Sequence, residues 1–475
     1  MNAERAARAQ WAPPAFLVLI GLAVGLDALP RWLSGLLLIG ALVFGAVAGT
    51  CRTIDMLALL AMSVPLQDVG NGEFFGASVT LTKLCLLCLA IGWTCRVAAG
   101  GRVPIDSVVW AYAAVAMALG ASIIAGSGVL AWAGELYRWL AAAFVFLVAK
   151  SEIRERAHVD RMILGISVGV FGVSVHAIRQ VMTSDGPPPF VVNGLLRAYG
   201  TFGQPNPLAA YLELSLPIVI AITILPVANR RRPALPPFSL LISTIAIAGG
   251  IVSLVLTQSR GGWLGFGAAG VVLLLGFPPR ARAGVAGGIA AAVAGGLVIG
   301  PGGDLADRLL SSFDGGGSRV HVTAENWSNE ERRAHWRAAL DMARASPWTG
   351  VGAGGFDNAY REYTSDWRFR VSRGHAHNGY LQMAAQAGWS GLVSFTCWVG
   401  VIAFKTTKSW RVEGICRADG RALGGVATVV AFGIHSMVDY LNVLSIGIQL
   451  ALALAIALAG LPSKTGMMTE GTDTP

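Results

Sequence analysis

Charged residues are scarce in this chain: Asp, Glu, Lys and Arg make up 13% of its 475 residues, whereas hydrophobic residues make up 54%. In soluble domains about a quarter of the residues are charged, so this composition excludes an ordinary soluble protein. Apolar runs of about 15–22 residues recur along most of the length, and a helix of that length can cross a bilayer. The sequence therefore predicts an all-α integral membrane protein.

Cysteine is also sparse, and the six cysteines do not form a disulfide framework. Cys85 and Cys88 have the spacing of a Cys-x-x-Cys pair, but they lie inside the apolar run 81–91 and no second pair follows. This context favours packing within an apolar helix over metal or redox chemistry.

The apolar runs predict a polytopic helical bundle with about 12–14 transmembrane helices, the number depending on whether the shorter runs span. The candidate spans are residues 16–29, 33–50, 54–67, 78–94, 106–125, 129–149, 162–181, 206–227, 238–257, 261–277, 283–300, 387–404, 422–437 and 441–460. The first follows Arg5 and Arg8 as a signal peptide would, but without a convincing cleavage site we expect a retained helix.

Hydropathy divides the chain into five regions. We expect N-terminal transmembrane helices in 1–190, central transmembrane helices in 191–301, a large polar loop in 302–386, C-terminal transmembrane helices in 387–462 and a cytoplasmic tail in 463–475.

The net charge of +9 could indicate a nucleic-acid partner, but most of the excess lies in short loops between spans, so we expect none. The basic residues fall on alternate loops: Arg96 and Arg102; Lys150, Arg154, Arg156 and Arg161; Arg230, Arg231 and Arg232; Arg280 and Arg282; and Lys405, Lys408, Arg411, Arg417 and Arg421. By the positive-inside rule these loops and both termini are cytoplasmic. Segments 183–207, 258–262 and 302–385 then lie on the opposite face, which in a bacterium is periplasmic or extracellular.

The long polar segment contains one clear helix signal. Ser328-Asn-Glu-Glu331 is a capping-box pattern, and Trp336, Ala339, Leu340 and Ala343 follow at helical spacing. This amphipathic helix fits one that lies on the membrane surface; the alternative is a helix packed inside a small soluble subdomain. The glycine-rich run 350–355 follows no strand and has no P-loop lysine, so it predicts a tight or flexible connection rather than a nucleotide site.

Four polar features are predicted on the non-cytoplasmic face: Arg197 to Pro207, Ser259 to Gly262, His377-Asn378, and His435 to Tyr440 with Asp439. Arginines at a membrane boundary often only extend to lipid head groups. Several of them beside histidine and a carboxylate instead suggest a site, because ionisable groups at a membrane are costly. The arginine fork grips phosphate oxygens in two places, so two or three together suit a pyrophosphate.

His377 and Asn378 stand where the chain re-enters the membrane, at a point where a lipid-borne and a water-side substrate could meet. A helix start disfavours positive charge, so we expect a neutral imidazole that can accept a proton from a hydroxyl nucleophile. A structural histidine at a helix start is one alternative. A metal site at His375-x-His377 is another, although no carboxylate or third histidine lies at ligand spacing.

His377-Asn378 followed after nine residues by Gly388-x-x-Gly391 resembles the signature of the O-antigen ligase family and its polymerase relatives. Arg197 to Pro207, Ser259-Arg-Gly-Gly-Trp263 and the block from Arg337 to Gly352 resemble further segments of that family, in the same order. The resemblance covers about residues 195–445. These proteins are integral membrane glycosyltransferases that use undecaprenyl-pyrophosphate-linked glycans.

The resemblance implies a GT-C-like bundle in the bacterial inner membrane, with its active site on the periplasmic side. It implies that Arg197 and Arg260 hold the donor pyrophosphate and that His377 and Asp439 are catalytic. It also implies that Arg337, a weaker match, and Asn378 bind substrate. It further implies transfer of a glycan to a lipid A-core sugar or another glycan acceptor, with inversion and without a metal or cofactor. No DxD-like metal motif lies on the outer face, and arginines can stabilise the leaving pyrophosphate instead.

Two alternatives remain. A polymerase would use the same donor class and differ only in its acceptor. A secondary transporter would also have many spans and buried charges, here Asp27, Asp55, Glu135 and Arg138, but such proteins usually show internal repeats, and we find none.

Overall fold

The computed structural model describes residues 53–66, 72–74, 77–101, 103–192, 194–284, 286–288, 327–364, 366–413 and 420–460. Within these residues the strands form two short hairpins, β1 (Gly72–Phe74) with β2 (Ala77–Val79) and β3 (Val191–Val192) with β4 (Leu195–Leu196). The apolar helices are α3 (Thr53–Ser63), α4 (Leu81–Ala98), α5 (Ser107–Ala121), α6 (Val129–Glu152), α7 (Arg156–Thr183), α8 (Pro205–Ala228), α9 (Pro237–Leu256), α10 (Arg260–Leu274), α15 (Gly379–Glu413), α16 (Arg421–His435) and α17 (Ile446–Ala457). The long polar segment adds α13 (Trp327–Ala345) and α14 (Phe356–Tyr363).

Seven of the described helices are long and apolar enough to cross a membrane: α4, α5 with the 3-10 turn Ser122–Ala125, α6, α7, α8, α9 and α15. Four shorter apolar helices, α3, α10, α16 and α17, also coincide with predicted spans. These matches confirm an all-α polytopic membrane protein. The predicted spans 16–29 and 33–50, and most of 283–300, lie outside the described residues.

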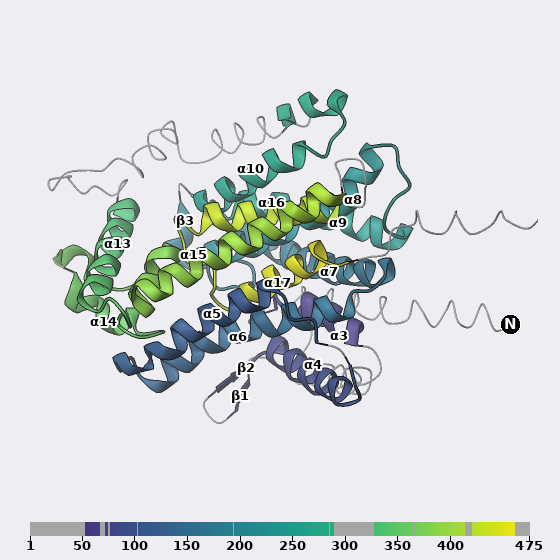
Figure 1. The fold of residues 1–475 in the computed structure, drawn as a ribbon. Helices are drawn as coiled ribbons and strands as arrows, with labels where there is room; N and C mark the ends of the chain where they lie inside the picture. Colours follow the sequence, from purple (N-terminus) through teal and green to yellow (C-terminus); the bar gives the residue numbers. More distant parts are fainter. Residues whose placement is uncertain are drawn as a thin grey trace, which may run out of the picture.

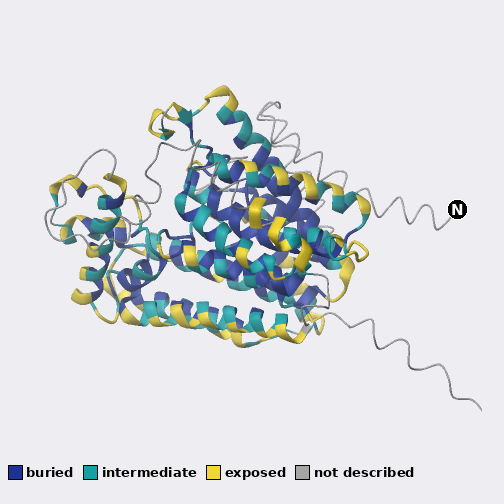
Figure 2. Ribbon diagram, turned by 90° about the horizontal axis from the view of Figure 1, so that it is seen from above, coloured by how far each residue is buried: buried dark blue, intermediate teal, exposed yellow. Residues whose placement is uncertain are grey.

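The outer surface of the bundle is apolar where it would meet lipid. Large apolar side chains are exposed on α4, α5, α6 and α9, among them Leu87, Trp110, Leu140 and Leu241. Buried residues concentrate in the middle of the bundle (Figure 2), and most residues of α8 are buried. Since a helix in water would turn polar side chains outward, this surface fits contact with lipid.

The loops sort into two ends of the bundle. Basic loops meet at one end, where Lys150 pairs with Asp106 and Arg96 pairs with Glu152. At the other end α13 and α14 gather beside the start of α15 (Figure 1). The predicted separation of basic loops from polar segments is thus present in the fold, and the assignment of the two ends to cytoplasm and periplasm stays a prediction.

α15 begins earlier than the predicted span 387–404, at Gly379, and is kinked in its interior. The kink lies at Ala387 and Gly388, and Gly388 has a φ of 64° and a ψ of −157°, a conformation that favours glycine. A Cβ at Gly388 would lie 2.2 Å from the carbonyl oxygen of Pro347, whose oxygen accepts a hydrogen bond from the Trp389 N–H. The predicted start therefore marks the kink, where the helix meets the polar segment.

The predicted helix after Ser328 is present as α13, and it ends before Pro347 as expected. Its apolar face is covered by protein: Ala338, Ala339 and Met342 pack with residues of α14 and α15. The Trp336 indole donates to the carbonyl oxygen of His377 (3.1 Å). These contacts favour the packed-subdomain alternative over a helix lying free on the membrane surface. The run 350–355 forms a tight turn, with positive φ at Gly350, Gly352 and Gly354.

Candidate active site

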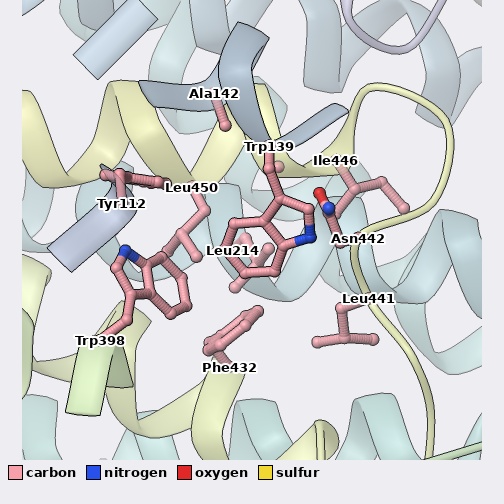
Figure 3. Close-up of a pocket in the computed structure, with 11 residues that line it drawn as sticks. Tyr112, Trp139, Ala142, Leu214, Trp398, Phe432, Leu441, Asn442, Ile446 and Leu450 are labelled. Atoms are coloured by element: carbon pink, nitrogen blue, oxygen red, sulfur yellow. The ribbon is translucent and has the colours of Figure 1, made fainter. Parts of the chain in front are cut away.

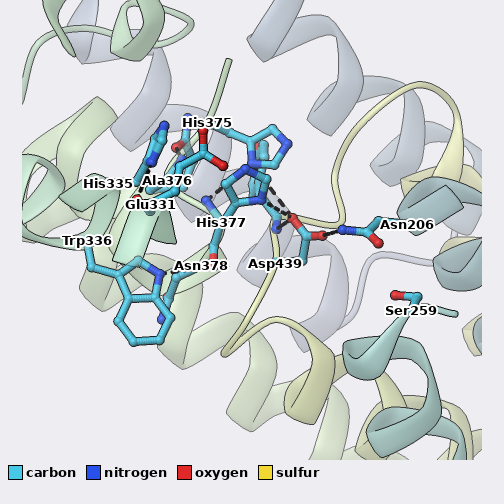
Figure 4. A network of polar contacts seen from close by, with 12 residues as sticks. Asn206, Ser259, Glu331, His335, Trp336, His375, Ala376, His377, Asn378 and Asp439 are labelled. Atoms are coloured by element: carbon cyan, nitrogen blue, oxygen red, sulfur yellow. Dashed lines mark hydrogen bonds and ion pairs between the residues drawn. The ribbon is translucent and has the colours of Figure 1, made fainter. Parts of the chain in front are cut away.

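The four polar segments predicted from the sequence meet at the end of the bundle that carries α13. The Arg197 guanidinium donates to the carbonyl oxygen of Thr257 (2.9 Å), which joins the segment before α8 to the end of α9, just before the turn into α10. The Gly379 N–H donates to the carbonyl oxygen of Ser436 (2.7 Å), which joins the start of α15 to the turn after α16. Figure 4 shows the side chains that converge there.

Asn378 fixes the segment that carries His377. Its Oδ1 accepts hydrogen bonds from the N–H groups of Tyr380 and Leu381, at 3.0 Å each, and so caps α15. Its Nδ2 donates to the carbonyl oxygen of Met437 (2.8 Å). This geometry gives Asn378 a positioning role, and the predicted contact of Asn378 with substrate stays a prediction.

His377 forms a pair with Asp439, 62 residues further along the chain. Its Nδ1 lies 3.1 Å from Asp439 Oδ1. The ionised carboxylate can only accept, so the Nδ1–H donates this hydrogen bond and Nε2 carries the free lone pair. Nε2 has no hydrogen-bond partner among the described residues, and 17% of the side chain is exposed. The imidazole is therefore oriented with one nitrogen held and the other available.

Asp439 is a buried carboxylate surrounded by donors. Besides His377 it accepts hydrogen bonds from the Asn206 side chain (2.8 Å) and from the Tyr440 N–H (2.8 Å). Burial would raise the pKa of Asp439, but the His377 hydrogen bond and the neighbouring histidines hold that pKa well below its usual range. Asp439 is therefore ionised at neutral pH.

Arg197 lies on the other side of Asn206. Its Nη2 donates to Asn206 Oδ1 (3.2 Å), so Asn206 bridges Arg197 and Asp439. Burial and the nearby Arg332 lower the pKa of Arg197 to about 10, which leaves the guanidinium charged at neutral pH.

Arg260 and Arg332 bring two further cations to this end of the bundle. Arg260 is the first residue of α10 and donates to Asn329 of α13 (2.9 Å). Arg332, one turn further along α13, lies close enough to Arg197 and His375 to lower the pKa of both. Arg332 is not among the site residues predicted from the sequence.

Arg337 occupies a different face of α13. It is exposed, and its charge acts on Asp366, whose pKa is lowered chiefly by a hydrogen bond from Arg368 and slightly by Arg337. The structure thus does not bring Arg337 together with His377 and Asp439, whereas it does bring Arg332 there.

His375 is largely buried beside the pair. Burial lowers the pKa of His375 to about 4, so the imidazole is neutral, and its Nδ1 accepts a hydrogen bond from the His377 N–H (3.2 Å). No carboxylate lies at ligand spacing from the His-x-His pair along the chain, but the fold brings the distant Asp439 to 3.7 Å from His375. The three side chains could surround a metal ion, but the carboxylate oxygens already accept three hydrogen bonds.

The charges that suggested a transporter have structural partners. Asp55 pairs with Arg161 (2.9 Å), and Glu135 pairs with Arg138; Asp27 lies outside the described residues. A cavity inside the bundle is lined by Trp139, Trp398 and other apolar side chains (Figure 3). Its volume is about 10 Å³, which is room for about one water molecule and none for a sugar.

The fold and this site define a polytopic membrane protein with a histidine–carboxylate pair beside clustered arginines. Residues 214–396 match the model of the O-antigen ligase family. The chain therefore carries an O-antigen ligase-like domain, which confirms the resemblance over a region that includes Arg260, Arg332 and His377. Arg197 and Asp439 lie outside the matched residues. No curated protein sequence matched the chain.

Proposed function

We propose that this protein transfers a glycan from an undecaprenyl-pyrophosphate donor to an acceptor hydroxyl, such as that of a lipid A-core sugar, at the periplasmic face of the inner membrane. The observation that carries the proposal is the His377–Asp439 pair, 3.1 Å apart, held beside arginines from three separate segments. The family match to O-antigen ligase supports this role in polysaccharide biosynthesis.

The chemistry is a single displacement. The acceptor hydroxyl gives its proton to Nε2 of His377 while its oxygen attacks the anomeric carbon. The bond from that carbon to the pyrophosphate oxygen breaks, and the lipid pyrophosphate leaves with the bonding electrons. Attack from the face opposite the leaving group inverts the anomeric centre. Asp439 orients the imidazole and stabilises the imidazolium that forms.

The arginines act on the leaving group. A pyrophosphate gains negative charge as the glycosidic bond breaks, and fixed cations placed where charge develops lower the barrier. Among the described residues, Arg197, Arg260 and Arg332 lie at this end of the bundle in positions that suit that role. Arg197 and Arg332 repel each other, and a bound dianion would relieve this repulsion. A metal ion is not required for this charge balance.

The test is transfer from a purified lipid-linked donor by the parent protein and by His377→Ala, Asp439→Asn and His375→Ala variants in detergent, each with and without a chelator. We expect His377→Ala to lose at least about 10²–10⁴-fold in rate, the usual contribution of a general base. His375→Ala should lose much less, and the chelator should leave the parent unchanged.

Equal losses in the two histidine variants, together with sensitivity to the chelator, would instead identify a His-x-His metal site. Full activity of both His377→Ala and Asp439→Asn would refute the proposed mechanism.

A further inference from the structure

A second histidine–carboxylate pair lies beneath the turn that carries Asp439. His435, the last residue of α16, has its Nδ1 2.7 Å from Oε1 of Glu213 on α8. The His435 side chain is 1% exposed and that of Glu213 is 0% exposed. Neither can touch a substrate, so this pair can affect the reaction only through residues that do.

α10 packs against this pair, and it carries glycine at the two positions that face His435 and Glu213. A Cβ at Gly261 would lie 2.5 Å from the imidazole of His435, and a Cβ at Gly265 would lie 2.4 Å from Oε2 of Glu213. No side chain fits at either position without displacing the pair. These glycines let the first turns of α10, which begins at Arg260, pack directly against the His435–Glu213 pair.

His435 connects the buried pair to Asp439 through its backbone. Its carbonyl oxygen accepts hydrogen bonds from the N–H groups of Val438 and Asp439, both at 2.9 Å. His435 is thus the residue whose side chain Glu213 holds and on whose carbonyl oxygen the turn that carries Asp439 closes.

The other side of the turn is held by a second buried carboxylate. The Tyr440 N–H donates to Asp439 Oδ1 (2.8 Å), and the Tyr440 hydroxyl donates to Glu135 of α6. Glu135 is itself paired with Arg138. The segment from His435 to Tyr440 is thus anchored at one end to α8 and at the other to α6.

We propose that Glu213 and Glu135 are positioning residues that hold Asp439 at its distance from His377. This inference rests on the proposed function. Through Glu135 it assigns a task to the N-terminal helix α6, which the family match does not cover. Burying a carboxylate in a helix bundle is costly unless a partner compensates it. Both carboxylates have such partners, and both partners lead to the same turn.

The experiment measures kcat and KM for the lipid-linked donor in purified parent, Glu213→Leu, Glu213→Gln and Tyr440→Phe proteins. Glu213→Leu removes the acceptor for His435, and we expect kcat to fall about 100-fold, the effect of roughly 1 Å of misplacement, with KM for the donor unchanged. Glu213→Gln keeps an acceptor for the His435 N–H and should restore most of kcat. Tyr440→Phe removes only the hydroxyl bonded to Glu135 and should lower kcat without changing KM.

Glu152→Leu is the matched control, because Glu152 is also buried and paired, with Arg96 at the opposite end of the bundle. It should keep the parent kcat. A double variant, Glu213→Leu with Asp439→Asn, should be no slower than Asp439→Asn alone, because residues acting through one group are not additive.

Parent-like kcat in Tyr440→Phe and Glu213→Leu, with Asp439→Asn inactive, would overturn the inference and leave the proposed function standing. A double variant slowed by the product of both effects would also overturn it. If Glu213→Leu fails to accumulate, Tyr440→Phe decides, because it keeps the ring and its packing. Parent-like activity of Asp439→Asn and His377→Ala would refute the proposed function and the inference together.

Discussion

Arg332 and Arg337 provide a matched test, because they lie five residues apart on α13 and only one faces the site. The family resemblance pointed to Arg337, as a weaker match, whereas the structure brings Arg332 near Arg197 and His375. The perturbation is replacement of each arginine by alanine in turn. We expect Arg332→Ala to impair transfer and Arg337→Ala to leave it close to that of the parent.

The magnitude follows from what Arg332 would contact. A hydrogen bond to a charged group contributes about 1.5–3 kcal/mol, which corresponds to about a 10–150-fold loss in kcat/KM for the donor. Stability should behave differently. Arg332 lowers the pKa of Arg197, which means that the two cations repel each other, so removing Arg332 should leave the melting temperature unchanged or raise it.

The assay is glycan transfer from a lipid-linked donor in detergent, with the melting temperature of each preparation measured in parallel. An active site that needs Arg332 will show lower activity at undiminished stability. Equal activity of the two alanine variants would refute the assignment of Arg332 to the donor. A lowered melting temperature with a proportionate loss of activity would show that Arg332 is structural.

Hydropathy predicted the helices, and the distribution of basic residues predicted that the four polar segments of the site lie on one face. A bilayer demands an apolar run for every crossing, and basic loops collect on one side of it. Helices such as α8 and α9 lie within a residue or two of their predicted bounds. The beginning of α15 was missed by eight residues because its first two turns, before the kink at Gly388, pack on protein beside α13.

The pairing inside the site could not be read from the sequence, because it depends on long-range contacts. His377 and Asp439 were both candidates, but nothing in their separation indicates a hydrogen bond. No carboxylate lies at ligand spacing from His375 along the chain, and the one beside it, Asp439, comes from 64 residues further on. Glu213 resembles any lone acidic residue within an apolar run.

The position of Arg332, by contrast, could have been predicted from its spacing to Trp336 along the helix. Residues four apart share one face of a helix, and Arg332 stands four residues before Trp336. The Trp336 indole donates to the backbone of His377, which places that face toward the site. Arg337 follows Trp336 directly and so points about 100° away around the helix.

Two further predictions concern stability. The pKa of His375 is lowered to about 4 in the folded protein, below its unfolded value of about 6.5. The unfolded chain therefore binds the proton first as the pH falls, and stability should decrease between about pH 6.5 and pH 4. His375→Gln should flatten that decline in melting temperature, and an unchanged slope would contradict the burial of a neutral imidazole. Gly388→Ala should be strongly destabilising, because alanine at a φ of 64° costs of order 1–3 kcal/mol and its Cβ would stand 2.2 Å from the Pro347 carbonyl oxygen. Gly400→Ala in the same helix is the control: a Cβ there has no neighbour within 4 Å, and alanine should stabilise a helix interior by about 0.5–1 kcal/mol. Since the kink sets where α15 meets the polar segment, Gly388→Ala should also reduce transfer, and equal melting temperatures for the two variants would show that α15 does not need its kink.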